Sequence, residues 1–153
     1  MKIVIVAFNK KYSEQFFLLN KAWIEESWRL EDSDKKDLLN PDKIIENGGQ
    51  VFFALDNKNV IGTVAMIKSS FDRFELAKMT VQEDFRGKGI ANMLMDECLE
   101  FAKQNNANEI FLISNDTLII ARKLYDKYGF KEVELDSQKY DRGNVKMNLK
   151  IIN

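Results

Sequence analysis

Histidine is absent from the 153-residue chain, and cysteine and proline each occur once. Without histidine, the chain can form neither a Ser-His-Asp or Cys-His hydrolase site nor a histidine-ligated metal site. The lone Cys98 excludes an internal disulfide and a multi-cysteine zinc or iron–sulfur site, so no metal is expected, and it fits a reducing compartment. The seven glycines are scattered and no low-complexity tract divides the chain, so residues 1–153 are predicted to form a single domain.

Neither the charge nor the hydropathy of the chain indicates a nucleic acid or a membrane as its partner. The 23 basic and 24 acidic residues give a net charge of −1, whereas nucleic-acid-binding domains usually carry a basic excess. The apolar stretch at residues 3–8 is too short for the core of a signal peptide or for a membrane span. We therefore expect a soluble cytoplasmic protein, and the sequence leaves a homodimer possible.

The pattern of apolar residues predicts a mixed α/β fold. β-Branched and aromatic runs between polar turns predict strands at residues 3–8, 51–55, 60–67, 74–81, 109–114, 130–135 and 145–151. Apolar residues at helical spacing predict helices at residues 13–24 with Ser13 as N-cap, 28–39 (whole or broken), 41–45, 90–104 and 117–128. This order, with hairpins first and crossover units later, predicts a mixed central sheet of about seven strands flanked by helices.

The most informative stretch is residues 82–92, where a strand runs into a bend with two glycines and a helix begins at once. Such a bend turns several backbone N–H groups toward the positive end of the helix dipole, which suits phosphate binding. The P-loop motif fails, because it needs glycine where the chain has Gln82 and serine or threonine where it has Gly89. The dinucleotide motif fails at its third glycine, which is Asn92 here. A nucleotide-binding module is therefore disfavoured.

The remaining pattern, Arg86-x-x-Gly89-x-Ala91, resembles the pyrophosphate loop of the GCN5-related N-acetyltransferases, the GNAT family. Further along, the stretch ARKLYDKYGF at residues 121–130 resembles the family motif Ala-x-x-Leu-Tyr-x-x-x-Gly-Phe. The resemblance implies a GNAT-like sheet whose splayed central strands form the acetyl-CoA cleft. It also implies transfer of an acetyl group from acetyl-CoA to a primary amine of a small molecule or peptide.

The resemblance further implies which residues bind the cofactor. Main-chain groups before the bend would bond the pantetheine arm, and main-chain amides in the bend would bond the pyrophosphate. Arg86 and Lys88 would add charge or lie in solvent, and Asn115 would bond the cofactor or a water, or cap its strand. The predicted cofactor-binding residues are Met79, Val81, Arg86, Gly87, Lys88, Gly89, Ile90, Ala91, Asn92 and Asn115.

Glu75 is the candidate base. An alkylamine has a pKa of ~10.4, so its deprotonation at pH 7 costs about 4–5 kcal/mol, and a carboxylate or a water relay would offset part of that cost. In a regular strand Glu75 would share a face with Ala77, Met79 and Val81, where burial would raise its pKa. A bulge would shift this alternation. Alternatively, Glu75 pairs with a nearby lysine or arginine, or only attracts a cationic substrate.

Tyr125 matches the family's tyrosine general acid. A phenol with a pKa of ~10 stays protonated at pH 7 and would donate a proton to a departing thiolate of pKa ~8.5. The alternative is that Tyr125 packs in the core. For the whole chain, the alternative function is a non-catalytic acyl-CoA-binding or regulatory module on the same scaffold.

Three further features receive structural interpretations. The charged run at residues 31–37 is predicted to be a solvated helix face, with Glu25 or Glu31 attracting a cationic acceptor as the alternative. Trp23 and Trp28 are predicted to lie in the core rather than to line an acceptor cleft. Cys98 falls on the apolar stripe of the helix at residues 90–104 and is expected to behave as a small buried hydrophobe.

Overall fold

The computed structural model describes residues 2–136 and 139–151, and its strands form one sheet in the order β1-β2-β3-β4-β5-β7-β6. The strands are β1 (Ile3–Ala7), β2 (Gln50–Asp56), β3 (Asn59–Ser70), β4 (Arg73–Val81), β5 (Glu109–Ser114), β6 (Lys131–Val133) and β7 (Val145–Lys150). Neighbouring strands are antiparallel except for β4 and β5, which are parallel. This mixed sheet confirms the predicted fold class.

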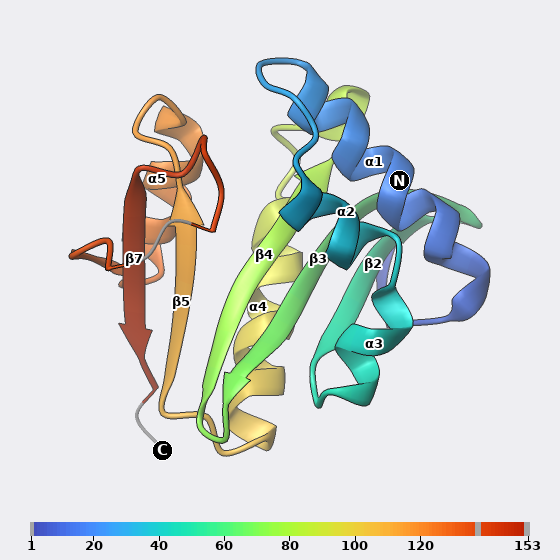
Figure 1. Cartoon of the computed structure of the whole chain (residues 1–153). Helices are drawn as coiled ribbons and strands as arrows, with labels where there is room; N and C mark the ends of the chain where they lie inside the picture. The colour runs from blue at the N-terminus through green and yellow to red at the C-terminus, as the bar shows by residue number, and fades with distance from the viewer. Residues whose placement is uncertain (1, 137–138, 152–153) are drawn as a thin grey trace.

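Helices cover both faces of the sheet (Figure 1). One face carries α1 (Ser13–Glu25), α2 (Asp32–Leu38) and α3 (Pro41–Glu46), and the other carries α4 (Ile90–Gln104) and α5 (Ile119–Lys127). Short 3-10 turns, η1 (Lys10–Tyr12) and η2 (Glu83–Phe85), precede α1 and α4. Within the described ranges, no helix combines the length and the apolar character that crossing a bilayer requires.

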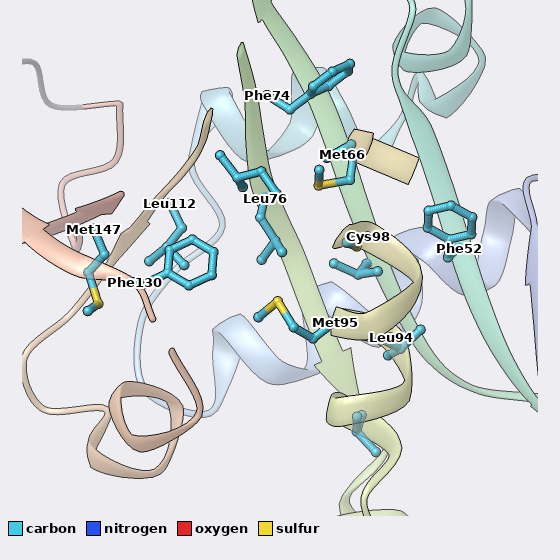
Figure 2. Packing of buried hydrophobic residues seen from close by; sticks show 14 of the residues in the cluster. Phe52, Met66, Phe74, Leu76, Leu94, Met95, Cys98, Leu112, Phe130 and Met147 are labelled. Carbon is cyan, nitrogen blue, oxygen red and sulfur yellow. The ribbon is translucent and has the colours of Figure 1, made fainter. Parts of the chain in front are cut away.

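Side chains of β2 pack alternately in two hydrophobic cores, one on each face of the sheet, because successive residues of a strand point to opposite faces. Phe52 packs in the core under α4, whereas Val51 and Phe53 pack under α1, α2 and α3. Figure 2 shows the α4 core, in which Cys98 lies among methionine and leucine side chains. Cys98 is 0% exposed, as expected for a small hydrophobe, and this burial raises the pKa of its thiol.

Several predicted element boundaries are wrong at their ends. Ser13 is the first residue of α1 rather than its N-cap, because η1 precedes it and is capped by the side chain of Asn9. The helix expected at residues 28–39 begins only at Asp32. There Glu31 and Asp34 form a capping box, in which the Glu31 N–H donates to Asp34 Oδ2 at 3.0 Å.

β4 and β5 pair only at their first residues. Arg73–Glu75 of β4 face Glu109–Phe111 of β5, and the register contains no later pair. From there the two strands diverge toward their C-terminal ends (Figure 1). The structure therefore confirms the splayed central strands, and the opening lies at the ends that lead into the glycine bend and into α5.

A β-bulge follows in β4, at the point where the strand has left β5. Lys78 and Met79 together oppose Val64 of β3, and Lys78 has a φ of 57°, in the left-handed region. From Met79 onward the alternation is shifted, and the side chains of Met79 and Val81 pack in the α4 core. Glu75 instead lies on the α2 side, so the face that a regular strand would give it with Met79 and Val81 is wrong.

Buried ion pairs join α2 to β4 and to the segment before β7. Asp34 is 0% exposed and accepts hydrogen bonds from both Nη atoms of Arg142, at 2.8 Å each, and from Lys78 Nζ at 2.8 Å. Burial raises the pKa of Asp34, but the Arg142 hydrogen bonds and the Lys78 charge outweigh it and hold this pKa well below its usual value. The solvated face predicted for residues 31–37 is therefore wrong at Asp34.

Asp34→Asn is expected to lower the free energy of unfolding by about 3–5 kcal/mol, because it leaves buried cations without their counter-charge. The matched change Asp32→Asn, on the exposed side of α2, is expected to cost at most about 1 kcal/mol. Urea unfolding at pH 7 measures both. Because the folded pKa of Asp34 is lowered, its contribution is present above about pH 4 and is lost as the pH falls further. Equal losses in the two variants would contradict the ion-pair assignment.

Candidate active site

The bend at residues 82–92 joins the C-terminal end of β4 to α4, at the open end of the split. Gly87 and Gly89 have φ values of 76° and 80°, which glycine adopts without strain. A Cβ placed on either glycine would meet no heavy atom within 4 Å, so both face open space. Among the described residues, no backbone acceptor pairs with an N–H of residues 87–92. The bend therefore presents a row of unused donors at the positive end of α4.

Side chains of the same segment anchor the bend. Ile90 is 2% exposed and packs in the α4 core, so its N–H belongs to the candidate site while its side chain is structural. The Arg86 side chain folds back toward β4. Its Nε donates to the Val81 carbonyl at 2.9 Å, and its Nη2 lies 3.4 Å from Oε1 of Glu26, the residue that follows α1. Lys88 is exposed. Arg86 thus braces the bend against β4 and α1, and Lys88 remains as the charge on its rim.

Met79 and Val81, the residues predicted to bond the pantetheine arm, lie on the part of β4 beyond Glu75. Among the described residues, the edge of this part has no strand partner on the β5 side, so its main-chain groups face the split. Met79 turns its side chain into the α4 core, which leaves its backbone at this edge. At Val81 the carbonyl is already bonded to Arg86.

Two tyrosines of α5 and its C-cap differ in what their hydroxyls do. The Tyr128 hydroxyl donates to Asp96 Oδ1 at 2.7 Å and lies 3.1 Å from the Asn92 carbonyl oxygen, which ties the end of α5 to the first turns of α4. Tyr125, one turn earlier, is partly buried against the α4 core. Its hydroxyl has no hydrogen bond within the described part of the chain, and burial raises the pKa of Tyr125 to about 12. The Tyr125 hydroxyl therefore stays protonated and donates a hydrogen bond to none of the described residues.

Asn115 is engaged on both sides of its amide. Its Nδ2 donates to the Arg142 carbonyl at 2.6 Å, and its Oδ1 accepts from the N–H and the hydroxyl of Thr117 at 2.9 and 2.6 Å. These bonds hold the turn after β5 against the segment before β7. The geometry thus supports the strand-end cap, the structural alternative for this residue.

Glu75 lies on the α2 side of the sheet and is 4% exposed. Its Oε1 is 2.8 Å from Lys139 Nζ, which is also 3.2 Å from Asp37 Oδ2, while Glu75 Oε2 is buried without a hydrogen-bond partner among the described residues. Burial lowers the pKa of Lys139, but the charge of Glu75 and its hydrogen bond, together with the charges of Tyr140 and Asp37, outweigh this effect and keep the pKa above its usual value. Pairing with a lysine, one of the alternatives for Glu75, is therefore what the structure shows. The sequence offered no signal for Asp37 and Lys139, which only the fold brings together.

A cavity of about 280 Å³ lies beside the bend, between α1 and the C-terminal end of β4. Its lining includes Trp23, Thr80 and Arg86. Trp23 also packs against the core under α1, so it both belongs to that core and borders open space. In the described residues, no group of three or more acidic or cysteine side chains is arranged to hold a metal ion.

The sequence model of the acetyltransferase (GNAT) family matches residues 11–130, which include both the glycine bend and the Tyr125 motif. N-acetylaspartate synthetase of Xenopus tropicalis is 39% identical over 87 residues, covering 56% of this chain and 32% of that protein. Human N-acetyltransferase 8B is 27% identical over 125 residues, covering 76% of this chain and 53% of that protein. The chain thus spans about a third to a half of the length of these relatives.

Solved structures agree with the sequence comparison. An acetyltransferase of the GNAT family from Staphylococcus aureus Mu50 superposes with a TM-score of 0.89 at 26% identity, over 97% of this chain and 99% of that one. PaiA N-acetyltransferase from Thermoplasma acidophilum, solved in complex with coenzyme A, has a TM-score of 0.81 at 17% identity, over 99% and 100% of the two chains. With its family model matched over most of its length and its split sheet in place, this chain belongs to the GNAT family of acetyltransferases.

Proposed function

We propose that this chain transfers an acetyl group from acetyl-CoA to a primary amine of a small molecule or peptide. The observation that carries the proposal is the row of N–H groups at residues 87–92, which have no backbone acceptor among the described residues, in a bend where Gly87 and Gly89 face open space. Such donors at a helix N-terminus suit a pyrophosphate. PaiA, which shares the fold, was solved with coenzyme A bound.

Each part of the site has a defined task toward the cofactor. The amides of residues 87–92 hold the pyrophosphate, Lys88 adds positive charge, and the free edge of β4 at Met79 holds the pantetheine arm. When bound, acetyl-CoA supplies an acetyl thioester. Arg86 and Asn115 act indirectly, because their side chains are occupied in bracing the bend and the turn after β5.

Glu75 and Tyr125 carry the proton transfers. Glu75, once Lys139 releases it, accepts a proton from the acceptor's ammonium group, directly or through a water. The neutral nitrogen then forms a bond to the acetyl carbon while the carbon–sulfur bond breaks. Tyr125 would donate its proton to the departing thiolate, and the nitrogen, positively charged after the new bond forms, would lose its surplus proton to the Tyr125 phenolate, directly or through a water. The products would be an N-acetyl amine and coenzyme A, and Glu75 would return its proton to solvent.

The raised pKa of Tyr125 changes the energy of the second transfer. A phenol of pKa about 12 giving its proton to a thiolate of pKa ~8.5 is uphill by about 5 kcal/mol, more than an unperturbed tyrosine would require. The same shift keeps the phenol protonated throughout the physiological range. Tyr125 is therefore available as a proton donor at every working pH.

A panel of amines tests the proposed function. Acetyl-CoA is offered with alkylamines, polyamines, peptide N-termini and amino acids, aspartate included because one relative is named N-acetylaspartate synthetase. Release of free thiol that depends on one of these amines is the expected result. A chain that binds coenzyme A in a calorimetric titration, yet releases no thiol with any of the amines, is the non-catalytic acyl-CoA-binding module instead.

Tyr125→Phe and Tyr128→Phe form a reciprocal pair. Tyr125→Phe is expected to lower kcat by about 10²–10⁴-fold with little change in stability or in acetyl-CoA affinity, because it removes only a proton donor. Tyr128→Phe is expected to lose about 1–2 kcal/mol of stability with its bond to Asp96, and to retain turnover. Steady-state kinetics and urea unfolding measure both variants. Unchanged turnover in Tyr125→Phe would remove this residue from the mechanism.

Glu75→Gln tests the base through the pH profile of kcat/KM. A general base works only in its unprotonated form, so the wild-type profile is expected to fall on its acid side. The variant should be much slower and should lack that fall. Glu109→Gln, a carboxylate change on β5 paired with Arg73, should leave the acid-side fall in place. If Glu75→Gln keeps the fall, another group titrates.

A further inference from the structure

Seven charged side chains on the α2 side of the sheet form two neighbouring ion-paired groups, which together we call the α2 cluster. Tyr140 lies between the groups: its hydroxyl accepts a hydrogen bond from Lys78 Nζ at 3.1 Å, and its ring centroid is 5.4 Å from Lys139 Nζ. The acids of the α2 cluster come from α2 and the residue before it and from β4, and its bases come from β4 and the segment before β7. The members are Glu31, Asp34, Asp37, Glu75, Lys78, Lys139 and Arg142. Four carboxylates face three cations, so the charge of these described residues sums to 3 − 4 = −1. The α2 cluster has room in its charge balance for one more monovalent cation.

The imbalance is concentrated at one end of the α2 cluster. Asp34 is matched by two cations, Lys78 and Arg142, and Arg142 also reaches Glu31 at 2.9 Å. At the other end, Glu75 and Asp37 share the single ammonium of Lys139, at 2.8 and 3.2 Å.

An unused acceptor lies at this same end. The Glu75 side chain is only 6% exposed, so solvent does not replace a protein donor. Its Oε2 is buried and has no hydrogen-bond donor within the described ranges. A buried carboxylate oxygen without a donor is costly, so a cation with several N–H groups is the group that this end lacks.

Lys139 differs from the other cations of the α2 cluster in its exposure. Its side chain is 32% exposed, against 3% for Lys78 and 12% for Arg142, so it reaches the carboxylates from the surface. Chemically, it presents a primary ammonium on an unbranched alkyl chain, which is also what a primary alkylamine acceptor presents at neutral pH. A primary ammonium that approaches Glu75 Oε1 would meet the Lys139 ammonium, which already lies 2.8 Å from that oxygen.

We infer that Lys139 is an internal stand-in for the acceptor: its ammonium occupies the Glu75–Asp37 end of the α2 cluster, and a primary alkylammonium binds there by displacing it. This rests on the proposed function in one respect, namely that Glu75 is the base which the acceptor must reach. Displacement frees Glu75 for proton transfer only when a substrate ammonium has replaced Lys139. Lys139 is thus a specificity-determining residue that sets acceptor affinity without taking part in the chemistry.

Removing the Lys139 ammonium should let an added primary alkylammonium bind beside Glu75 and Asp37. Lys139→Met keeps an unbranched side chain but leaves Glu75 and Asp37 without their cation. We expect n-butylammonium, at about ten times its dissociation constant, to raise the Tm of Lys139→Met by about 4 °C, because a ligand that binds only the folded state stabilises it. In wild type, where Lys139 competes, the apparent affinity should be about tenfold weaker and the rise smaller.

Matched controls separate this site from general effects of charge. Tetramethylammonium has no N–H to donate, so it should not raise the Tm of either protein. We refer to a rise in Tm caused by an added ammonium ion as rescue. Lys21→Met removes one exposed cation, paired with Glu25 on α1, and should respond to n-butylammonium as wild type does. If Lys139→Met does not fold, Lys139→Gln takes its place, because its amide retains a donor toward Glu75. Equal rescue of wild type and the Lys139 variant, or rescue by tetramethylammonium, would overturn the inference.

The thermal-rescue experiment and the amine panel test different claims, so either can fail without the other. Thermal rescue needs no acetyl transfer, so it can succeed even if no amine releases thiol, and that outcome would count against the proposed function alone. Conversely, amine-dependent turnover with no selective rescue would leave the proposed function standing and reject the stand-in role of Lys139. Where both hold, the KM for the acceptor should fall about tenfold in Lys139→Met with kcat unchanged.

Discussion

Parallel strands β4 and β5 hydrogen-bond only at their first residues, and the candidate site depends on their separation beyond that point. Because the strands diverge, one backbone edge of β4 has no strand partner in the described part of the chain, where neighbouring strands of a sheet would normally hydrogen-bond. The bulge at Lys78 and Met79 comes in the same stretch and sends neighbouring side chains to different layers. Sheet divergence, free donors in the bend and the sorting of side chains are therefore parts of one local arrangement.

The split also creates a need for contacts that hold the two halves of the sheet together. On the α4 side, the Tyr128 hydroxyl joins α5 to Asp96 and the first turn of α4. On the α2 side, Arg142 reaches from the segment before β7 to Asp34 and Glu31. Apolar packing alone would be thin where two strands diverge, and directional bonds fix the width that packing leaves open. Stability and site geometry are consequently set by many of the same residues.

Much of this arrangement could be predicted from the sequence, because it is encoded locally. Apolar periodicity located the strands and helices to within a few residues, and the glycine spacing after β4 identified the bend. The missing parts depend on contacts between distant residues. The residues around Asp34 give no sign that it will be buried in ion pairs with Lys78 and Arg142. Likewise, the residues around Glu75 give no sign of its pairing with Lys139, which lies 64 positions further along the chain. A bulge that puts Met79 and Val81 on the opposite face from Glu75 could be foreseen from the sequence, but its position could not, since Lys78 carries no glycine-like signal for its positive φ.

The deep placement of Cys98 has a practical consequence for studying this protein. It is the chain's only cysteine, and it is 0% exposed with a thiol whose pKa is raised by burial. Thiol-directed colorimetric reagents require an accessible thiolate, so the folded protein should contribute almost no background signal to them. A cysteine introduced at any surface position would likewise be the only reactive one, which makes the chain suitable for single-site spectroscopic probes.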